Sequence, residues 1–176
     1  MRAFIACPLT KAVEEYLKKL CLALPEASLV IPRQFDLTIK FLGDVPDNLL
    51  PVIQERLARL MVTPFEAHLS HVGVFSKNYL RVVWAGVEPA DRFERIHHEV
   101  EEMLAPLVPI DERYAPHITL TRIRSVRDRQ QFLDRLAAIT VEPISFPGDQ
   151  LVLMKSELTD NGAVHTPLFT TETGRG

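Results

Sequence analysis

Apolar and polar residues alternate over residues 35–42 (FDLTIKFL), a period typical of a β-strand with one packed face and one free face. The apolar positions, ending at Phe41, are expected to pack. The polar positions are Asp36, Thr38 and Lys40. The pattern therefore places three groups capable of chemistry on one side of one strand.

The rest of the chain shows interleaved helical and strand periods. Helical spacing of apolar residues predicts helices over 11–24 (with Thr10 as N-cap), after Pro46, over 89–105 and over 126–139. Strand-like runs occur at 2–9, 65–75, 79–87, 117–123, 142–158 and 163–170. Because several strands are joined by short turns, the pattern favours antiparallel sheets. The predicted fold class is α+β, and not a doubly wound parallel sheet. With no low-complexity linker, residues 1–176 are expected to form one bilobal domain.

Composition narrows the classes of function. The chain has 176 residues, 47% of them apolar, with a net charge of −3 and a pI near 6.1. Such a charge disfavours a broad basic face for long nucleic acids, whereas a local site for an RNA end or a nucleotide stays possible. Cys7 and Cys21 lie in apolar runs, which indicates buried thiols and a reducing compartment. No apolar run approaches a membrane span, so we expect a cytoplasmic monomer.

One short pattern occurs twice, as Asp36-Leu37-Thr38-Ile39 and as His117-Ile118-Thr119-Leu120. Residues two apart on a strand share a face, so each copy presents an ionisable side chain beside a hydroxyl. Two such strands facing one another would surround a phosphoryl group with an acid, a base and hydrogen-bond donors. Taken singly, an H-x-T tripeptide is more typical of an ordinary half-buried strand than of a catalytic site. The repeat indicates two pseudo-symmetric lobes.

Five segments, in this order and spacing, carry a resemblance to a known family. They are RAFIA, FDLTIKFLGDV, YLRVVWAGV, YAPHITLTRI and LMKSELTDNGAVHTPL. The chain resembles the RNA 2′,3′-cyclic phosphodiesterases, also called 2′-5′ RNA ligases, of the two-histidine phosphoesterase superfamily. The family signature is H-x-T-x, present twice, with an active-site cleft between two lobes. Here the second copy is intact, while the first has Asp36 in place of histidine.

The resemblance implies hydrolysis of RNA or nucleotide 2′,3′-cyclic phosphate ends to 2′-phosphates without metal or cofactor, and weak 2′-5′ RNA ligation. His117 takes the general base's position and Asp36 the general acid's. A free aspartate has a pKa near 3.9 against about 6.5 for histidine, so an unshifted Asp36 has no proton to give at neutral pH. Losing that transfer would cost on the order of 10²–10⁴ in rate, whereas burial that raises the pKa would restore it.

Two alternatives to this cyclic phosphodiesterase stay open. The first is a catalytically impaired protein that binds RNA ends or nucleotides. The second is an enzyme for other cyclic phosphates such as ADP-ribose 1″,2″-cyclic phosphate, because a cleft with two motifs tolerates different leaving groups.

The supporting residues are assigned from the same pattern. Thr38 and Thr119 are expected to bind phosphate oxygens, and Lys40 is either a cationic group of the site or a solvated lysine. Arg122 matches a family arginine that contacts phosphate, but strict alternation places it on the wrong face unless the strand bulges. Tyr114 and Phe41 are expected to pack, and His165 to be structural.

Overall fold

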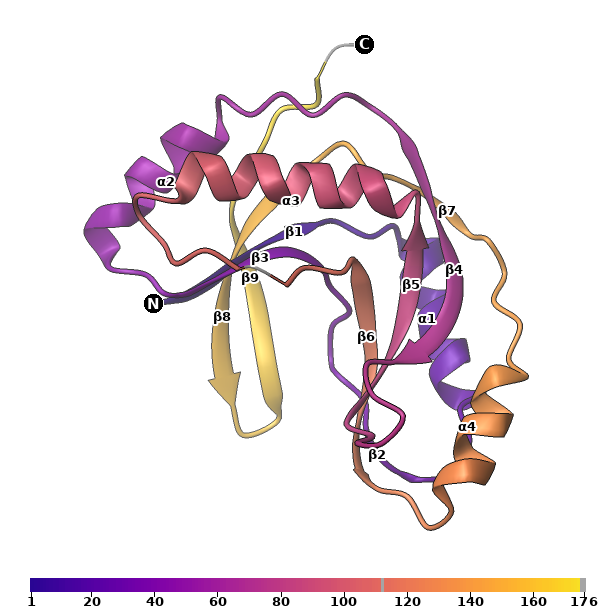
Figure 1. Ribbon diagram of the computed structural model, residues 1–176. Helices are drawn as coiled ribbons and strands as arrows, with labels where there is room; N and C mark the ends of the chain where they lie inside the picture. Colours follow the sequence, from indigo (N-terminus) through magenta and orange to yellow (C-terminus); the bar gives the residue numbers. More distant parts are fainter. Residues whose placement is uncertain (112, 175–176) are drawn as a thin grey trace.

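The strands of the protein form one curled antiparallel sheet. The computed structural model describes residues 1–111 and 113–174. Within these residues, nine strands form one sheet in the order β7-β4-β5-β6-β3-β1-β8-β9, with β2 paired to β6 (Figure 1). The strands are β1 (Arg2–Cys7), β2 (Ser28–Val30), β3 (Leu37–Asp44), β4 (Glu66–Val74), β5 (Val82–Glu88), β6 (His117–Ser125), β7 (Ser145–Pro147), β8 (Val152–Thr159) and β9 (Gly162–Thr170).

The helices follow the predicted periods closely. They are α1 (Lys11–Leu22), the short 3-10 helix η1 (Asp47–Leu49) with α2 (Leu50–Leu57), α3 (Ala90–Leu104) and α4 (Arg129–Ala137). The Thr10 hydroxyl caps α1 by accepting from the backbone N–H of Val13 at 3.3 Å. Asp128 caps α4 by accepting from Gln131 N–H at 2.9 Å, so this helix begins later than predicted. The α+β prediction is confirmed.

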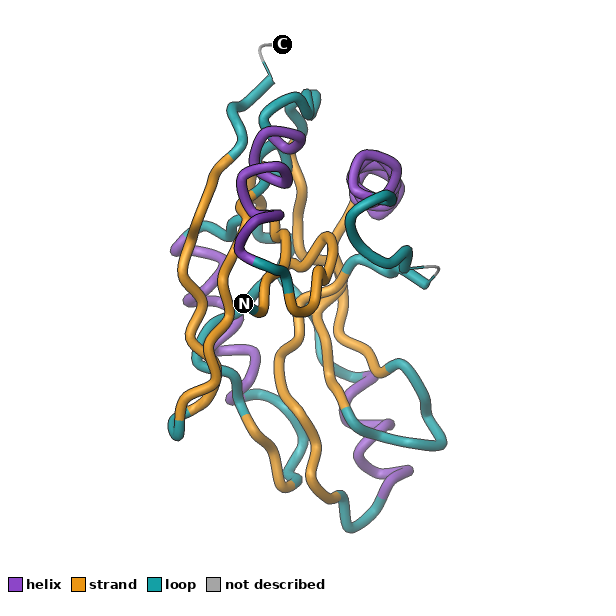
Figure 2. Tube along the Cα trace, turned by 90° about the vertical axis from the view of Figure 1, so that its left-hand side faces the viewer, coloured by secondary structure: helices purple, strands orange, loops and turns teal. Residues whose placement is uncertain are grey.

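Two halves of the sheet meet where β6 pairs with β3: one is β7-β4-β5-β6 with β2, and the other is β3-β1-β8-β9. Helices α1 and α4 pack on the half containing β4 and β6, and α3, with α2 beside it, packs on β3. Since α1 follows β1 of one half and covers the other, the chain crosses between the halves. In Figure 2, α3 is seen end-on beside the strands. The predicted two-lobed arrangement is confirmed.

The pattern of apolar and polar residues did not predict two local features of the sheet. Strand β2 is only three residues long, too short for an alternating pattern. The run predicted as one strand over 142–158 divides into β7 and β8. Between them Gly148 lies against Phe65, where an added Cβ would come within 2.3 Å of the ring. Within the described residues, no helix has the length and hydropathy needed to cross a membrane.

Candidate active site

The two repeated motifs lie on neighbouring strands in the middle of the sheet. Strands β3 and β6 are antiparallel with Leu37 opposite Ile118, and both side chains are completely buried. Side chains alternate along a strand and opposite residues share a face. The polar residues of both motifs therefore share the other face, each threonine opposite the first residue of the other motif. We call this the motif face; it carries Asp36, Thr38, His117 and Thr119.

The imidazole of His117 is oriented by its own chain. Its Nδ1 lies 2.7 Å from the carbonyl oxygen of Ala115, which can only accept, so Nδ1 carries the proton and donates it. This contact fixes the tautomer and leaves Nε2 unprotonated in the neutral ring. The ring of Phe75 meets the imidazole edge-on, with centroids 4.8 Å apart at 88°. His117 is therefore set up to accept a proton at Nε2.

A β-bulge brings Arg122 to the motif face. In the pairing of β5 with β6, Trp84 is opposite Thr119 but Val83 is opposite Thr121, so one extra residue is inserted in β6. Thr121 is thereby turned into the core, where it is 0% exposed, and Arg122 follows on the same face as Thr119. The bulge that the Arg122 assignment required is present.

A matching bulge removes Lys40 from the motif face. In the pairing of β1 with β3, Ala6 is opposite Thr38 but Ile5 is opposite Lys40. The expectation that Lys40 lies beside Asp36 and Thr38 is wrong: the lysine is 2% exposed and turned toward α3. It is therefore not placed to bind phosphate. For the same reason Phe41, expected to pack, is 64% exposed.

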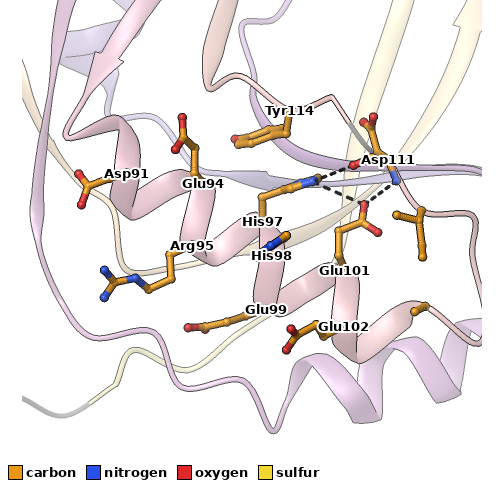
Figure 3. A pocket seen from close by; sticks show the side chains of 12 residues that line it. Asp91, Glu94, Arg95, His97, His98, Glu99, Glu101, Glu102, Asp111 and Tyr114 are labelled. Atoms are coloured by element: carbon orange, nitrogen blue, oxygen red, sulfur yellow. Dashed lines mark hydrogen bonds and ion pairs between the residues drawn. The ribbon is translucent and has the colours of Figure 1, made fainter.

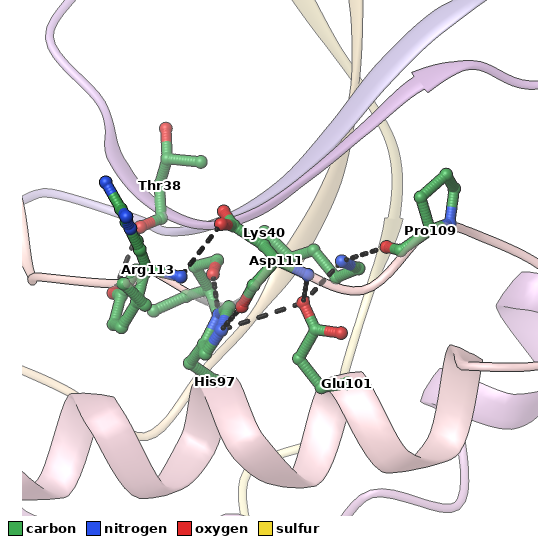
Figure 4. Close-up of polar contacts among 9 residues, drawn as sticks. Thr38, Lys40, His97, Glu101, Pro109, Asp111 and Arg113 are labelled. Carbon is green, nitrogen blue, oxygen red and sulfur yellow. Dashed lines mark hydrogen bonds and ion pairs between the residues drawn. The ribbon is translucent and has the colours of Figure 1, made fainter.

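Lys40 belongs instead to a buried polar network between β3 and α3 (Figure 4). Its Nζ lies 2.5 Å from Oε1 of Glu101 and donates to the carbonyl oxygen of Pro109 at 2.8 Å. The same carboxylate oxygen accepts from Asp111 N–H at 3.0 Å, and Nδ1 of His97 lies 2.7 Å from the Ile39 carbonyl oxygen. These contacts fasten the segment that precedes β6 to strand β3.

Asp36 is half-buried beside a histidine from the other end of the chain. Nδ1 of His165, on β9, lies 2.8 Å from Oδ2 of Asp36. The contact is an ion pair without good hydrogen-bond alignment of the ring nitrogen. The pKa of Asp36 is raised, because burial outweighs the charge and hydrogen bonding of His165, which lower it. The carboxyl group of the first motif therefore has the His165 imidazole as its neighbour.

Aromatic side chains continue the surface beyond His117, and the sequence pattern did not single them out. Phe75, 59% exposed, lies between His117 and Trp84, with its centroid 5.7 Å from the indole. Gly86 is opposite His117, and an added Cβ there would come within 2.7 Å of the His71 ring. In the sequence, these residues are marked only by the recurrence of aromatic side chains between residues 71 and 84. Strands that pack in a core commonly show the same recurrence.

A hollow of about 990 Å³ runs along α3, away from the motifs (Figure 3). Acidic side chains of the helix, among them Glu94 and Glu102, line it together with His97 and Tyr114. None of the motif-face residues contributes to its wall. We therefore place the chemistry at the motif face and not in this hollow.

The fold and the motif face are those of one class of protein: two-lobed phosphoesterases whose two motifs lie on neighbouring strands where the lobes join. The chain belongs to the 2′-5′ RNA ligase superfamily, whose family model matches residues 37–160.

Individual relatives span nearly the same length. A protein of Thermus thermophilus named RNA 2′,3′-cyclic phosphodiesterase is 34% identical over 154 residues, covering 79% of this chain and 72% of the relative. One of the same name from Methanothermobacter thermautotrophicus is 29% identical over 177 residues, 96% of each chain.

Solved structures show the same arrangement. A crystal structure of a Thermus thermophilus protein has a TM-score of 0.74 at 31% identity, covering 97% of this chain and 96% of that one. The structure of E. coli LigT complexed with 3′-AMP has a TM-score of 0.76 at 22% identity, covering 96% and 95%. The second likeness shows the fold alone.

Proposed function

We propose that this protein hydrolyses 2′,3′-cyclic phosphate ends of RNA or nucleotides to 2′-phosphates. The observation that carries the proposal is the register of β3 and β6, which places an oriented histidine, two threonine hydroxyls and an arginine on one face. The relatives named RNA 2′,3′-cyclic phosphodiesterase support the substrate class. The cyclic phosphate of an RNA end or a nucleotide is small enough to be held by these groups alone.

Each group has a role that follows from its chemistry. Nε2 of His117 removes a proton from the attacking water, because the tautomer set by Ala115 leaves that nitrogen free. Thr38 and Thr119 donate hydrogen bonds to the non-bridging phosphate oxygens, and the strands hold them rigidly. The Arg122 guanidinium neutralises the charge that accumulates on phosphorus oxygens in the transition state.

The same groups serve ligation from the same cyclic phosphate. If a ribose 5′-hydroxyl takes the place of water, His117 removes its proton as its oxygen bonds to phosphorus. The bond from phosphorus to the 3′-oxygen breaks, that oxygen takes a proton, and a 2′-5′ linkage forms. In dilute RNA, water outcompetes the hydroxyl, so ligation is the minor reaction. The proposed chemistry assigns no step to a metal ion.

The test is turnover of 2′,3′-cyclic AMP in EDTA, with separation of 2′-AMP from 3′-AMP. We expect 2′-AMP, and a loss on the order of 10²-fold or more in kcat/KM for His117→Ala, because one proton transfer is removed. No product above background from the wild-type protein would refute the proposal. If 2′-AMP bound without any turnover of the cyclic compound, a binding protein for RNA ends would take its place.

A further inference from the structure

The two positions that carry unexpected residues touch one another. Asp36 stands where the first motif of the family has a histidine, and His165, on β9, is its ion-pair partner at 2.8 Å. The two residues are 129 positions apart in the sequence, and β9 lies at the far edge of its half-sheet from β3. Through this contact, the imidazole of His165 lies beside the position where the first motif of the family has its histidine.

The His165 ring is held from several sides. Its backbone N–H donates to Oε1 of Gln34 at 2.8 Å, which ties β9 to the segment that leads into Asp36. The edge of its ring meets Phe4, with centroids 4.8 Å apart at 73°. The His165 side chain is 16% exposed, so it is fixed but not sealed from solvent.

We propose that His165 is the general acid of this enzyme and that Asp36 positions it. Nδ1 faces the Asp36 carboxyl group, so Nε2 is the ring nitrogen left for the substrate. This inference rests on the function proposed above and assigns one of its two proton transfers.

The pair resolves the charge problem that a lone aspartate would create. An isolated Asp36 carboxylate would repel a phosphate and carry no proton at neutral pH. The His165 imidazole, 2.8 Å from the Asp36 carboxyl group, gives the position a ring nitrogen that can carry a proton. The position thus offers a proton to an anionic substrate, as a single histidine would.

The step balances without a further reactant. His117 takes one proton from water as the water oxygen bonds to phosphorus. The bond from phosphorus to the ribose 3′-oxygen breaks, and Nε2 of His165 gives its proton to that oxygen. The product is a 2′-phosphate with a free 3′-hydroxyl. Proton exchange with solvent returns both histidines to their starting forms.

A general acid is recognised by its dependence on the leaving group. We would compare 2′,3′-cyclic AMP with the analogue in which sulfur replaces the bridging 3′-oxygen, because a thiolate leaves without protonation. For His165→Phe, which keeps an aromatic ring against Phe4, we expect kcat to fall by about 10²–10⁴ on the oxygen substrate. On the sulfur analogue we expect a change below about tenfold, because no proton transfer to the leaving group is needed there, whereas His117→Ala slows both.

Asp36→Asn tests the positioning role, since it keeps the side chain's shape and removes its charge. We expect a lower kcat on the oxygen substrate with KM little changed, and near-normal turnover of the sulfur analogue. His98→Phe makes the same exchange on the exposed side of α3 and serves as the matched control, with no effect on either substrate. Thermal unfolding of each variant separates loss of folding from loss of chemistry.

A second background makes the test independent of folding effects. Asp36→His restores the first motif, and in that background we expect His165→Phe to cost far less than it does in the wild type. An equal loss on both substrates, or an equal loss in both backgrounds, would overturn the proposal for His165. If the wild-type protein turned over neither substrate, the proposed function itself would fail, so the two failures are distinguishable.

Discussion

The phenolic hydroxyl of Tyr114 donates a hydrogen bond to the carbonyl oxygen of Thr38 at 3.1 Å. Its ring stacks on His97 with centroids 4.1 Å apart at 6°. Burial raises the pKa of Tyr114, so the hydroxyl stays protonated and remains a donor. Tyr114 therefore braces the segment entering β6 against the strand of the first motif, consistent with its expected packing role.

We expect Tyr114→Phe to lower the free energy of unfolding by about 1 kcal/mol, because the hydrogen bond is lost and the stacked ring remains. Its kcat/KM should fall less than about tenfold, since the brace sets only the spacing of the motifs. Urea unfolding and cyclic-nucleotide turnover measure the two effects. Tyr16→Phe is the control: its hydroxyl accepts from Glu142 N–H at 2.8 Å, away from the motif face. If both variants left turnover unchanged, the brace would have no part in positioning the motifs.

We predict that Lys40 contributes to the stability of the fold and not to substrate binding or turnover. Lys40→Met removes the lysine partner of the buried Glu101 carboxyl group, which should destabilise the fold by about 3–5 kcal/mol. The double variant Lys40→Met with Glu101→Leu removes both charges and should recover most of that loss. Turnover by the folded double variant should stay within a few-fold of wild type. If the double variant regained stability but its kcat/KM fell about 10-fold or more, the prediction would be wrong. A loss of that size is expected when a charged hydrogen bond to the substrate is removed, so Lys40 would then contact the substrate.

Strict alternation predicted the sheet faces correctly up to the bulges and wrongly after them. Leu37 and Ile118 are core residues, as their apolar character and spacing predict. Each motif strand then gains one residue, so that Lys40 and Thr121, at equivalent places, both turn inward. A bulge depends on which residues the neighbouring strands supply, and a single strand's pattern does not contain that information. The family resemblance anticipated Arg122, whereas alternation alone did not.

His165 illustrates a different limit. The sequence pattern predicts its strand, but its partner Asp36 lies 129 positions away. Nothing in the local pattern around either residue indicates that β9 folds back on the segment before β3. Contacts of this kind follow from the sheet order and the Gln34 anchor, which only the three-dimensional arrangement reveals.

Arg122 should bind the phosphate through its planar fork. We expect Arg122→Met to lower kcat/KM for the cyclic nucleotide by roughly 10- to 100-fold, the loss typical of a charged hydrogen bond. Arg122→Lys should recover only part of this, because an ammonium keeps the charge but not the two-pronged geometry. Arg135→Met, on the exposed side of α4, removes a similar charge away from the motif face and should change little. Equal effects at the two arginines would indicate general electrostatic steering instead of a contact.

Cys7 should make the protein less stable in alkali. Burial raises the pKa of its thiol from 9.0 to about 12, with Asp149 adding to the shift. Because the unfolded chain loses this proton at lower pH than the folded chain, the stabilising contribution of the buried thiol is present below about pH 9 and declines as the pH rises toward about 12. Between about pH 9 and 10, we expect wild type to lose about 1 kcal/mol more unfolding free energy than Cys7→Ala. Urea unfolding of both proteins across this interval measures the difference, and parallel curves would show that the thiol does not control the loss.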